Sequence, residues 1–134
     1  MISRDDFLIE EALKNREMAY CPYSGFAVGA ALLAGSGNVY GGCNVESAAF
    51  SPTVCAERTA ICKAVSEGER EFVAIAIVGG KEGEEITDFC LPCGVCRQML
   101  AEFCTDTFEI ICINGKEAKT YTLGQLLPEA FGMK

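Results

Sequence analysis

Histidine is absent from this 134-residue sequence. Imidazole is the commonest nitrogen ligand for metals in proteins, so any metal site in the chain has to be built from thiolates or other non-imidazole groups. Cysteine, in contrast, occurs nine times. The absence of histidine therefore directs attention to the spacing of the cysteines.

The chain also lacks an excess of positive charge. Its 11 Lys and Arg residues stand against 19 Asp and Glu residues, which gives a formal net charge of -8, and the basic residues are scattered without forming a run. Proteins that bind nucleic acids usually present a basic surface to the phosphates. We therefore expect no nucleic-acid partner.

Long apolar stretches are missing as well. The first six residues, Met1 to Asp6, contain no apolar core of a signal peptide, and no stretch is long enough to span a membrane. We expect no membrane partner and a cytoplasmic location, where thiols stay reduced. An odd number of cysteines also argues against a fully paired disulfide framework.

Length and pattern together predict one domain, residues 1–134, without linkers or repeats. The pattern predicts helices at 3–20 (with Ser3 as N-cap), at 54–67, from Pro92–Gly94 onward and at 123–127, and strands at 26–33, 39–41, 72–78, 108–113 and 116–122. A hairpin followed by two strand–helix–strand passages predicts an α/β fold. We expect a three-layer α-β-α sandwich around a mixed, roughly five-stranded sheet.

Two short motifs carry the chemistry of the sequence. They are Cys55-Ala56-Glu57 and, thirty-five residues further on, Pro92-Cys93-Gly94-Val95-Cys96. Each is expected near the N-terminus of a helix, where partial positive charge and free N–H groups favour thiolate over thiol. Thiolates from Cys55, Cys93 and Cys96 would hold one Zn²⁺ per chain and leave the fourth tetrahedral position open for water, as in catalytic zinc sites.

Glu57 and Arg58 complete the expected site. Zinc lowers the pKa of water from about 15.7 toward about 7. Glu57 can accept the proton of that water and return it, acting as general base and then as general acid. Three thiolates give the site a net charge of -1, which would make the water less acidic, and hydrogen bonds from Arg58 to the sulfurs would offset that charge.

The remaining cysteines are expected to be small, buried apolar residues. They are Cys21, Cys43, Cys62, Cys90, Cys104 and Cys112. Two of them leave another interpretation open, because Cys90 or Cys62 as a fourth ligand would close the site into a structural zinc module without chemistry. A thioredoxin-like redox role for Cys93 and Cys96 is weaker, since it leaves Cys55-Ala56-Glu57 unexplained.

The motifs have the pattern of zinc deaminases, and the chain resembles the small cytidine deaminases of the homotetrameric, three-cysteine kind. Four blocks in the same order carry the resemblance: Tyr23-Ser24-Gly25-Phe26-Ala27-Val28-Gly29-Ala30-Ala31, Gly42-Cys43-Asn44-Val45-Glu46, Cys55-Ala56-Glu57-Arg58-Thr59-Ala60 and Pro92-Cys93-Gly94-Val95-Cys96-Arg97-Gln98. It implies hydrolysis of cytidine and 2′-deoxycytidine to the uridine forms and ammonia, in pyrimidine salvage. It also implies a homotetramer whose neighbouring subunits complete each site.

The resemblance further implies how a small nucleoside substrate binds. Asn44 and Glu46 match the pair that hydrogen-bonds the ribose 3′-hydroxyl, and Phe26 matches the aromatic residue that stacks near the pyrimidine. The N–H of Ala56 and the carboxylate of Glu57 would read the ring's O2 and N3. The carbonyl of residue 91 would meet the amine, and Phe131 is a candidate contribution to a neighbouring site.

The chain departs from the family pattern at three positions. Phe50 stands where tyrosine is common, Ser47 where asparagine is common, and Leu91 where a small polar residue is usual. These departures bear on sugar and substrate preference and touch neither zinc nor the proton transfer. A deaminase of another aminopyrimidine nucleoside, such as the blasticidin type, shares the metal motifs and is the nearest alternative enzyme.

Overall fold

A mixed five-stranded sheet forms the middle layer of the structure, a computed structural model that describes residues 2–133. Its strands are β1 (Phe26–Ala34), β2 (Val39–Cys43), β3 (Phe72–Lys81), β4 (Glu109–Ile113) and β5 (Ala118–Thr122), in the order β2-β1-β3-β4-β5. Strand β1 is antiparallel to both β2 and β3, and β4 is antiparallel to β5. Strands β3 and β4 are parallel, so the predicted mixed sheet is confirmed.

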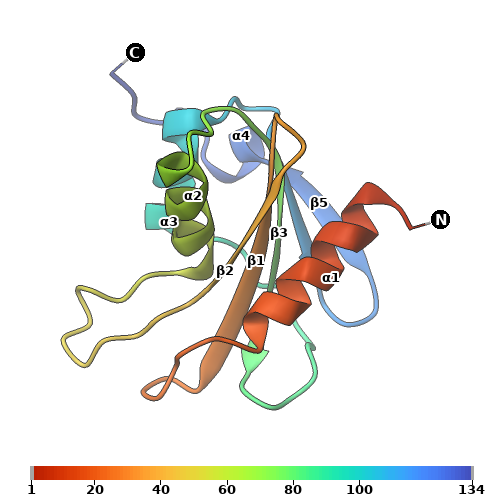
Figure 1. The fold of residues 1–134 in the computed structure, drawn as a ribbon, viewed down its shortest axis with the longest axis vertical. Helices are drawn as coiled ribbons and strands as arrows, with labels where there is room; N and C mark the ends of the chain where they lie inside the picture. The colour runs from red at the N-terminus through yellow and green to blue at the C-terminus, as the bar shows by residue number, and fades with distance from the viewer. Residues whose placement is uncertain (1, 134) are drawn as a thin grey trace.

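Helices cover both faces of this sheet (Figure 1). They are α1 (Arg4–Arg16), α2 (Ala56–Ser66), α3 (Gly94–Phe103) and the short α4 (Leu123–Leu126). Leu8 and Ala12 of α1 pack against one face, while Ile61 of α2 and Leu100 of α3 are buried in a second apolar cluster on the other face. The three-layer α-β-α architecture expected from the sequence is therefore present.

Helix α1 begins where the sequence predicts and ends earlier. The Ser3 hydroxyl accepts a hydrogen bond from the N–H of Asp6 at 3.1 Å, which confirms the N-cap. The predicted end at residue 20 is wrong, because the backbone of Tyr20 is paired elsewhere. Its N–H donates to the carbonyl of Asn44 at 3.0 Å, and its carbonyl accepts from the N–H of Glu46 at 2.9 Å.

Two strands are longer than their apolar runs. Strand β2 extends to Cys43, and β3 extends through Gly79 and Gly80 to Lys81. In the sheet, Gly79 lies opposite Val28 and Gly80 opposite Ala27. Glycine has little intrinsic preference for strands, so the sequence alone ends these strands too early and the pairing with β1 extends them.

The expectation of six buried cysteines is correct for two residues only. Cys21 and Cys112 are buried, and Cys43, Cys90 and Cys104 are half-buried. Cys62 is exposed, because α2 turns Ala60, Ile61 and Ala64 toward the sheet and leaves Cys62 on its outer side. No helix within residues 2–133 combines the length and apolar character needed to cross a bilayer.

Candidate active site

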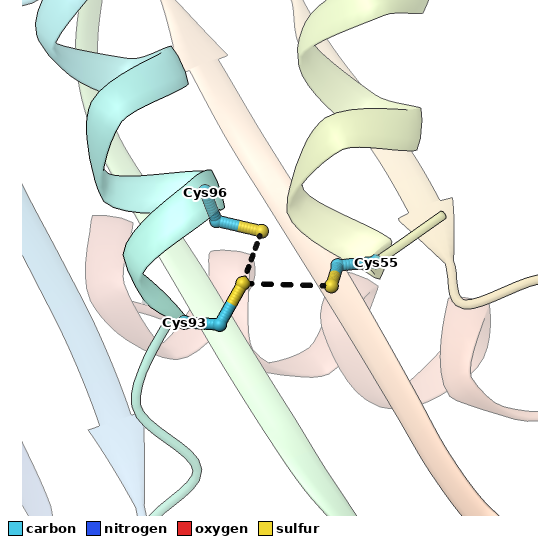
Figure 2. A group of neighbouring side chains, drawn as sticks. All are labelled: Cys55, Cys93 and Cys96. Atoms are coloured by element: carbon cyan, nitrogen blue, oxygen red, sulfur yellow. Dashed lines mark hydrogen bonds between the residues drawn. The ribbon is translucent and has the colours of Figure 1, made fainter. Parts of the chain in front are cut away.

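Three cysteine sulfurs from two helices converge on one point (Figure 2). The Sγ atom of Cys93 lies 3.8 Å from that of Cys55 and 3.5 Å from that of Cys96, and all three sulfurs lie within 4.8 Å of one another. Tetrahedral Zn–S bonds of about 2.3 Å require sulfurs about 3.8 Å apart. The donor set therefore fits one zinc ion in both chemistry and spacing.

The local fold places these sulfurs at the N-termini of α2 and α3. Cys55 is the N-cap of α2 and Cys93 is the N-cap of α3, and neither side chain caps its own helix, so both sulfurs are available to a metal. Gly42 of β2 lets α2 approach the sheet closely, because a Cβ atom there would lie 2.5 Å from the carbonyl oxygen of Ala56. The aligned peptide dipoles of the two helices favour thiolates at this point.

Arg58 lies beside the sulfurs. Its Nη2 atom donates to the Sγ atom of Cys55 at 3.3 Å and to the carbonyl of Thr53 at 3.5 Å. Hydrogen bonds from Cys96 and from Arg58 hold the pKa of Cys55 well below its usual value. Arg58 therefore contacts one of the three sulfurs, and its role in balancing their charge stays a prediction.

Glu57 is a buried carboxyl group next in sequence but one to Cys55. It is the second residue of α2 and is only 4 % exposed. Burial raises the pKa of Glu57 to about 7, and the negative charge of Cys55 acts in the same direction. A carboxyl group with a pKa near neutrality can accept a proton in one step and donate it in the next.

A cavity of about 340 Å³ opens beside the sulfurs. Its lining residues come from β1, from the segment after β2, from the start of α2 and from the loop before α3: Ser24, Phe26, Val28, Asn44, Glu46, Thr53, Val54, Cys55, Ala56, Glu57, Cys90, Leu91 and Cys93. Every sequence-predicted substrate residue is in this set. A cavity of that size, mostly apolar with a few converging polar groups, suits a small organic ligand.

Asn44 and Glu46 are both held firmly at the cavity wall. The amide of Asn44 accepts from the N–H of Val28 and donates to the carbonyl of Phe26, each at 2.8 Å. One amide N–H and one oxygen lone pair of Asn44 remain after these bonds. The carboxylate of Glu46 accepts from the N–H groups of Tyr23 and Ser24, at 3.0 and 3.1 Å, and from the Ser24 hydroxyl.

Ser24 and Gly79 contribute to the site without having been identified from the sequence, and Cys90 was considered there only as a fourth ligand or a buried apolar residue. Ser24 belongs to the first of the four blocks and had no role assigned, yet its hydroxyl fixes Glu46 and lowers the pKa of that carboxyl. Cys90 lines the cavity, and burial raises the pKa of its thiol to about 12. Gly79 makes room for Cys90, because a Cβ atom at Gly79 would lie 2.7 Å from the Cys90 sulfur.

A closed structural zinc site does not form among residues 2–133. The metal-competent group there consists of Cys55, Cys93 and Cys96 without a fourth member. Cys62 faces outward from α2, and Cys90 packs its sulfur beside Gly79. A zinc ion held by these three thiolates would therefore have a fourth position for a ligand that is not a protein side chain, as catalytic zinc sites do.

An open three-thiolate zinc site with a buried carboxyl group defines a metal-dependent hydrolytic class. The family model described as "cytidine and deoxycytidylate deaminase zinc-binding region" matches residues 2–112. A cytidine deaminase of Sporosarcina psychrophila is 51% identical over 125 residues, covering 92% of this chain and 88% of the relative. The chain belongs to the cytidine and deoxycytidylate deaminase family.

Two further comparisons refine this result. The crystal structure of cytidine deaminase from Burkholderia pseudomallei superposes with a TM-score of 0.86 and 44% identity, covering 97% of this chain and all of that chain, 100%. A blasticidin-S deaminase of Bacillus cereus is 34% identical over 131 residues, covering 95% of this chain and 92% of the relative. The identity is thus higher to the cytidine deaminases of Sporosarcina psychrophila and Burkholderia pseudomallei than to this blasticidin-S deaminase.

Proposed function

We propose that the chain catalyses the zinc-dependent hydrolysis of cytidine and 2′-deoxycytidine to uridine and 2′-deoxyuridine, with release of ammonia. The observation that carries the proposal is the position of Glu57, a buried carboxyl group that shares one cavity with Cys55 and Cys93. When bound by the three thiolates, zinc supplies a water-derived nucleophile at neutral pH. The chain's own residues then have to bind the nucleoside and move protons.

Proton transfer falls to Glu57. Its carboxylate takes the proton released by the attacking water and delivers it to the ring nitrogen N3. It then takes a second proton, from the hydroxyl group newly attached to C4, and passes it to the departing amine as the C4–N bond breaks and the C4 carbonyl forms. Both deliveries require a group whose pKa is close to the working pH, and burial gives Glu57 a pKa of about 7. Arg58 keeps the thiolates from becoming too electron-rich through its bond to Cys55.

Nucleoside binding falls to the cavity wall. Phe26 stacks near the pyrimidine, the N–H of Ala56 and the carboxylate of Glu57 read O2 and N3, and the carbonyl of Leu91 meets the amine. Asn44 and Glu46 hydrogen-bond the ribose hydroxyl with the donor and acceptor capacity that their bonds to the chain leave free. All six residues line the same cavity, which supports this assignment.

We further propose a cytoplasmic homotetramer that serves pyrimidine salvage. Phe26 and Leu91 of the cavity wall are exposed apolar side chains, and further exposed apolar side chains are Tyr20, Tyr23, Val45, Phe50 and Val95. Exposed apolar surface of this kind favours burial against a second copy of the chain. The nine unpaired cysteines suit a reducing compartment.

A deaminase of the blasticidin type is the second candidate, favoured by the relative from Bacillus cereus. To decide between the two, purified protein is incubated with cytidine and separately with blasticidin S. Ammonia release, loss of the substrate's ultraviolet absorbance and bound zinc are measured on the same sample. Turnover of cytidine with one zinc per chain supports the proposal, whereas full zinc loading with turnover of blasticidin S alone contradicts it.

A further inference from the structure

Arg97 makes two hydrogen bonds that the proposed chemistry does not use. It follows Cys96 on α3, and its Nε atom donates to the carbonyl of Pro92 at 2.7 Å. Its Nη1 atom donates to the carbonyl of Leu126, the last residue of α4, at 2.8 Å. One guanidinium therefore connects the loop before Cys93 to the C-terminal part of the chain.

We propose that Arg97 is a positioning residue that fixes Cys93 for zinc. The carbonyl of Pro92 lies in the same planar peptide unit as the N and Cα atoms of Cys93. A hydrogen bond to that oxygen therefore fixes the orientation of the peptide plane that precedes Cys93. Pro92 is less than 2 % exposed, and a buried carbonyl oxygen requires a donor, which here is a charged one.

Cys93 has particular need of this support. Among the three thiol ligands, Cys96 is buried and Cys55 is half-buried, whereas Cys93 is exposed. Leu91 and Gly94 are also exposed, so Pro92 is the buried residue of the segment 91–94. The sulfur of Cys93 lies within 3.8 Å of both other sulfurs, so a shift of its backbone would disturb both contacts.

The second bond of Arg97 makes the support rigid. Leu126 lies beyond the region that the family model matches, which ends at residue 112. The planar guanidinium spans two carbonyls in a fixed fork, and a lysine ammonium cannot reproduce that geometry. Arg97 thus connects the loop that carries Cys93 to α4 through these two hydrogen bonds.

The test compares three variants of the zinc-loaded protein. R97Q removes the fork, R97K keeps the charge without the fork, and R70Q is the matched control. Arg70 also bonds two backbone carbonyls, those of Val65 and Glu69, at 2.9 and 2.8 Å. Val65 lies in the last turn of α2 and Glu69 follows that helix, so both carbonyls lie near the end of α2 opposite to Cys55.

The first readout is the rate at which zinc passes to a chromophoric chelator, at a temperature well below the melting point of each variant. We expect release from R97Q to be roughly 10- to 100-fold faster than from the parent protein, as is typical when a group that orients a metal ligand is lost. R97K should lie between R97Q and the parent, and R70Q should match the parent. If R97Q does not fold, the rate of zinc release from R97K tests the proposal in its place.

Either Arg97 variant releasing zinc as slowly as R70Q would overturn the proposal. The second readout rests on the proposed function: kcat for cytidine per zinc-loaded chain should fall in R97Q while KM changes little, since Arg97 does not line the cavity. Because kcat is counted per zinc-loaded chain, a smaller folded and zinc-loaded fraction alone would not lower it. If the parent itself fails to turn over cytidine, the proposed function fails, and the zinc-release comparison still decides the role of Arg97.

Discussion

At the scale of single residues, two opposing effects act on Glu57. It lies in the first turn of α2, where the helix dipole favours a carboxylate. Burial disfavours the charge and is the larger effect, because the pKa of Glu57 rises to about 7. Both protonation states of the side chain are therefore populated near neutral pH. A group that accepts a proton in one step and donates it in another requires this.

Glu57→Gln is expected to keep zinc and lose turnover. Glutamine has nearly the same shape and cannot carry the proton, so kcat for cytidine should fall by about 10²- to 10⁴-fold. Steady-state kinetics and a zinc assay on the same preparation measure both effects. Glu67→Gln, at the exposed C-terminal end of the same helix, is the control and should behave like the parent. Substantial activity in Glu57→Gln would refute the mechanism.

The residues that sequence analysis found and those it missed differ in how their roles arise. Cys55, Cys93, Cys96 and Glu57 have roles that depend on ligand chemistry and helix position, and both can be inferred from short motifs. The contacts of Ser24 depend on folding. Ser24 and Glu46 are 22 residues apart, so only the tertiary structure brings them together.

At the scale of elements, one carboxylate joins the β1–β2 turn to the connection between α2 and β3. Glu69 accepts from the Ser36 hydroxyl at 2.6 Å, from the Tyr40 hydroxyl at 2.8 Å and from the Asn38 amide at 3.3 Å. The hydrogen bond from Ser36 is the main reason that the pKa of Glu69 lies below its usual value. Glu69 thus connects the β1–β2 hairpin to the C-terminal end of α2, the helix whose N-terminal end carries Cys55 and Glu57.

This connection predicts a pH-dependent stability. Because folding lowers the pKa of Glu69, its contribution is present above the unfolded value of about 4.3 and is lost as the pH falls through the folded value. Glu69→Gln should therefore melt below the parent at pH 7, and the gap should close on acidification toward pH 3. Thermal melts of both proteins across that range measure the gap. Ser36→Ala should reproduce part of the loss at pH 7, and a gap that is constant with pH would exclude this role for Glu69.

The elements themselves were predictable wherever apolar periodicity decides them. The boundaries that failed are those set by pairing with distant backbone. Tyr20 leaves the expected helix because Asn44 and Glu46 bind its backbone, and Gly79 and Gly80 join β3 because β1 lies beside them. Such long-range hydrogen bonds override the weak local preferences of the residues concerned.

At the scale of the whole molecule, the segment between β2 and α2 stands out from the body of the fold (Figure 1). It carries Phe50, which is 79 % exposed and has a backbone φ of 60°. A left-handed conformation costs a bulky residue about 1–2 kcal/mol, and exposing an aromatic ring to water adds to that cost. Both costs are offset if the ring is buried against another copy of the chain.

The proposed tetramer therefore predicts a specific role for Phe50. Light scattering should give a mass four times that of one chain, and Phe50→Ala should weaken the assembly and reduce activity toward cytidine at low protein concentration. Phe7→Ala is the matched control, because Phe7 is 41 % exposed and lies on α1, on the sheet face opposite α2 and α3. The mass and the activity of that variant should stay at parent values. Full activity of the parent protein as a monomer would show that each site is complete within one chain, and Phe50 would then need another partner.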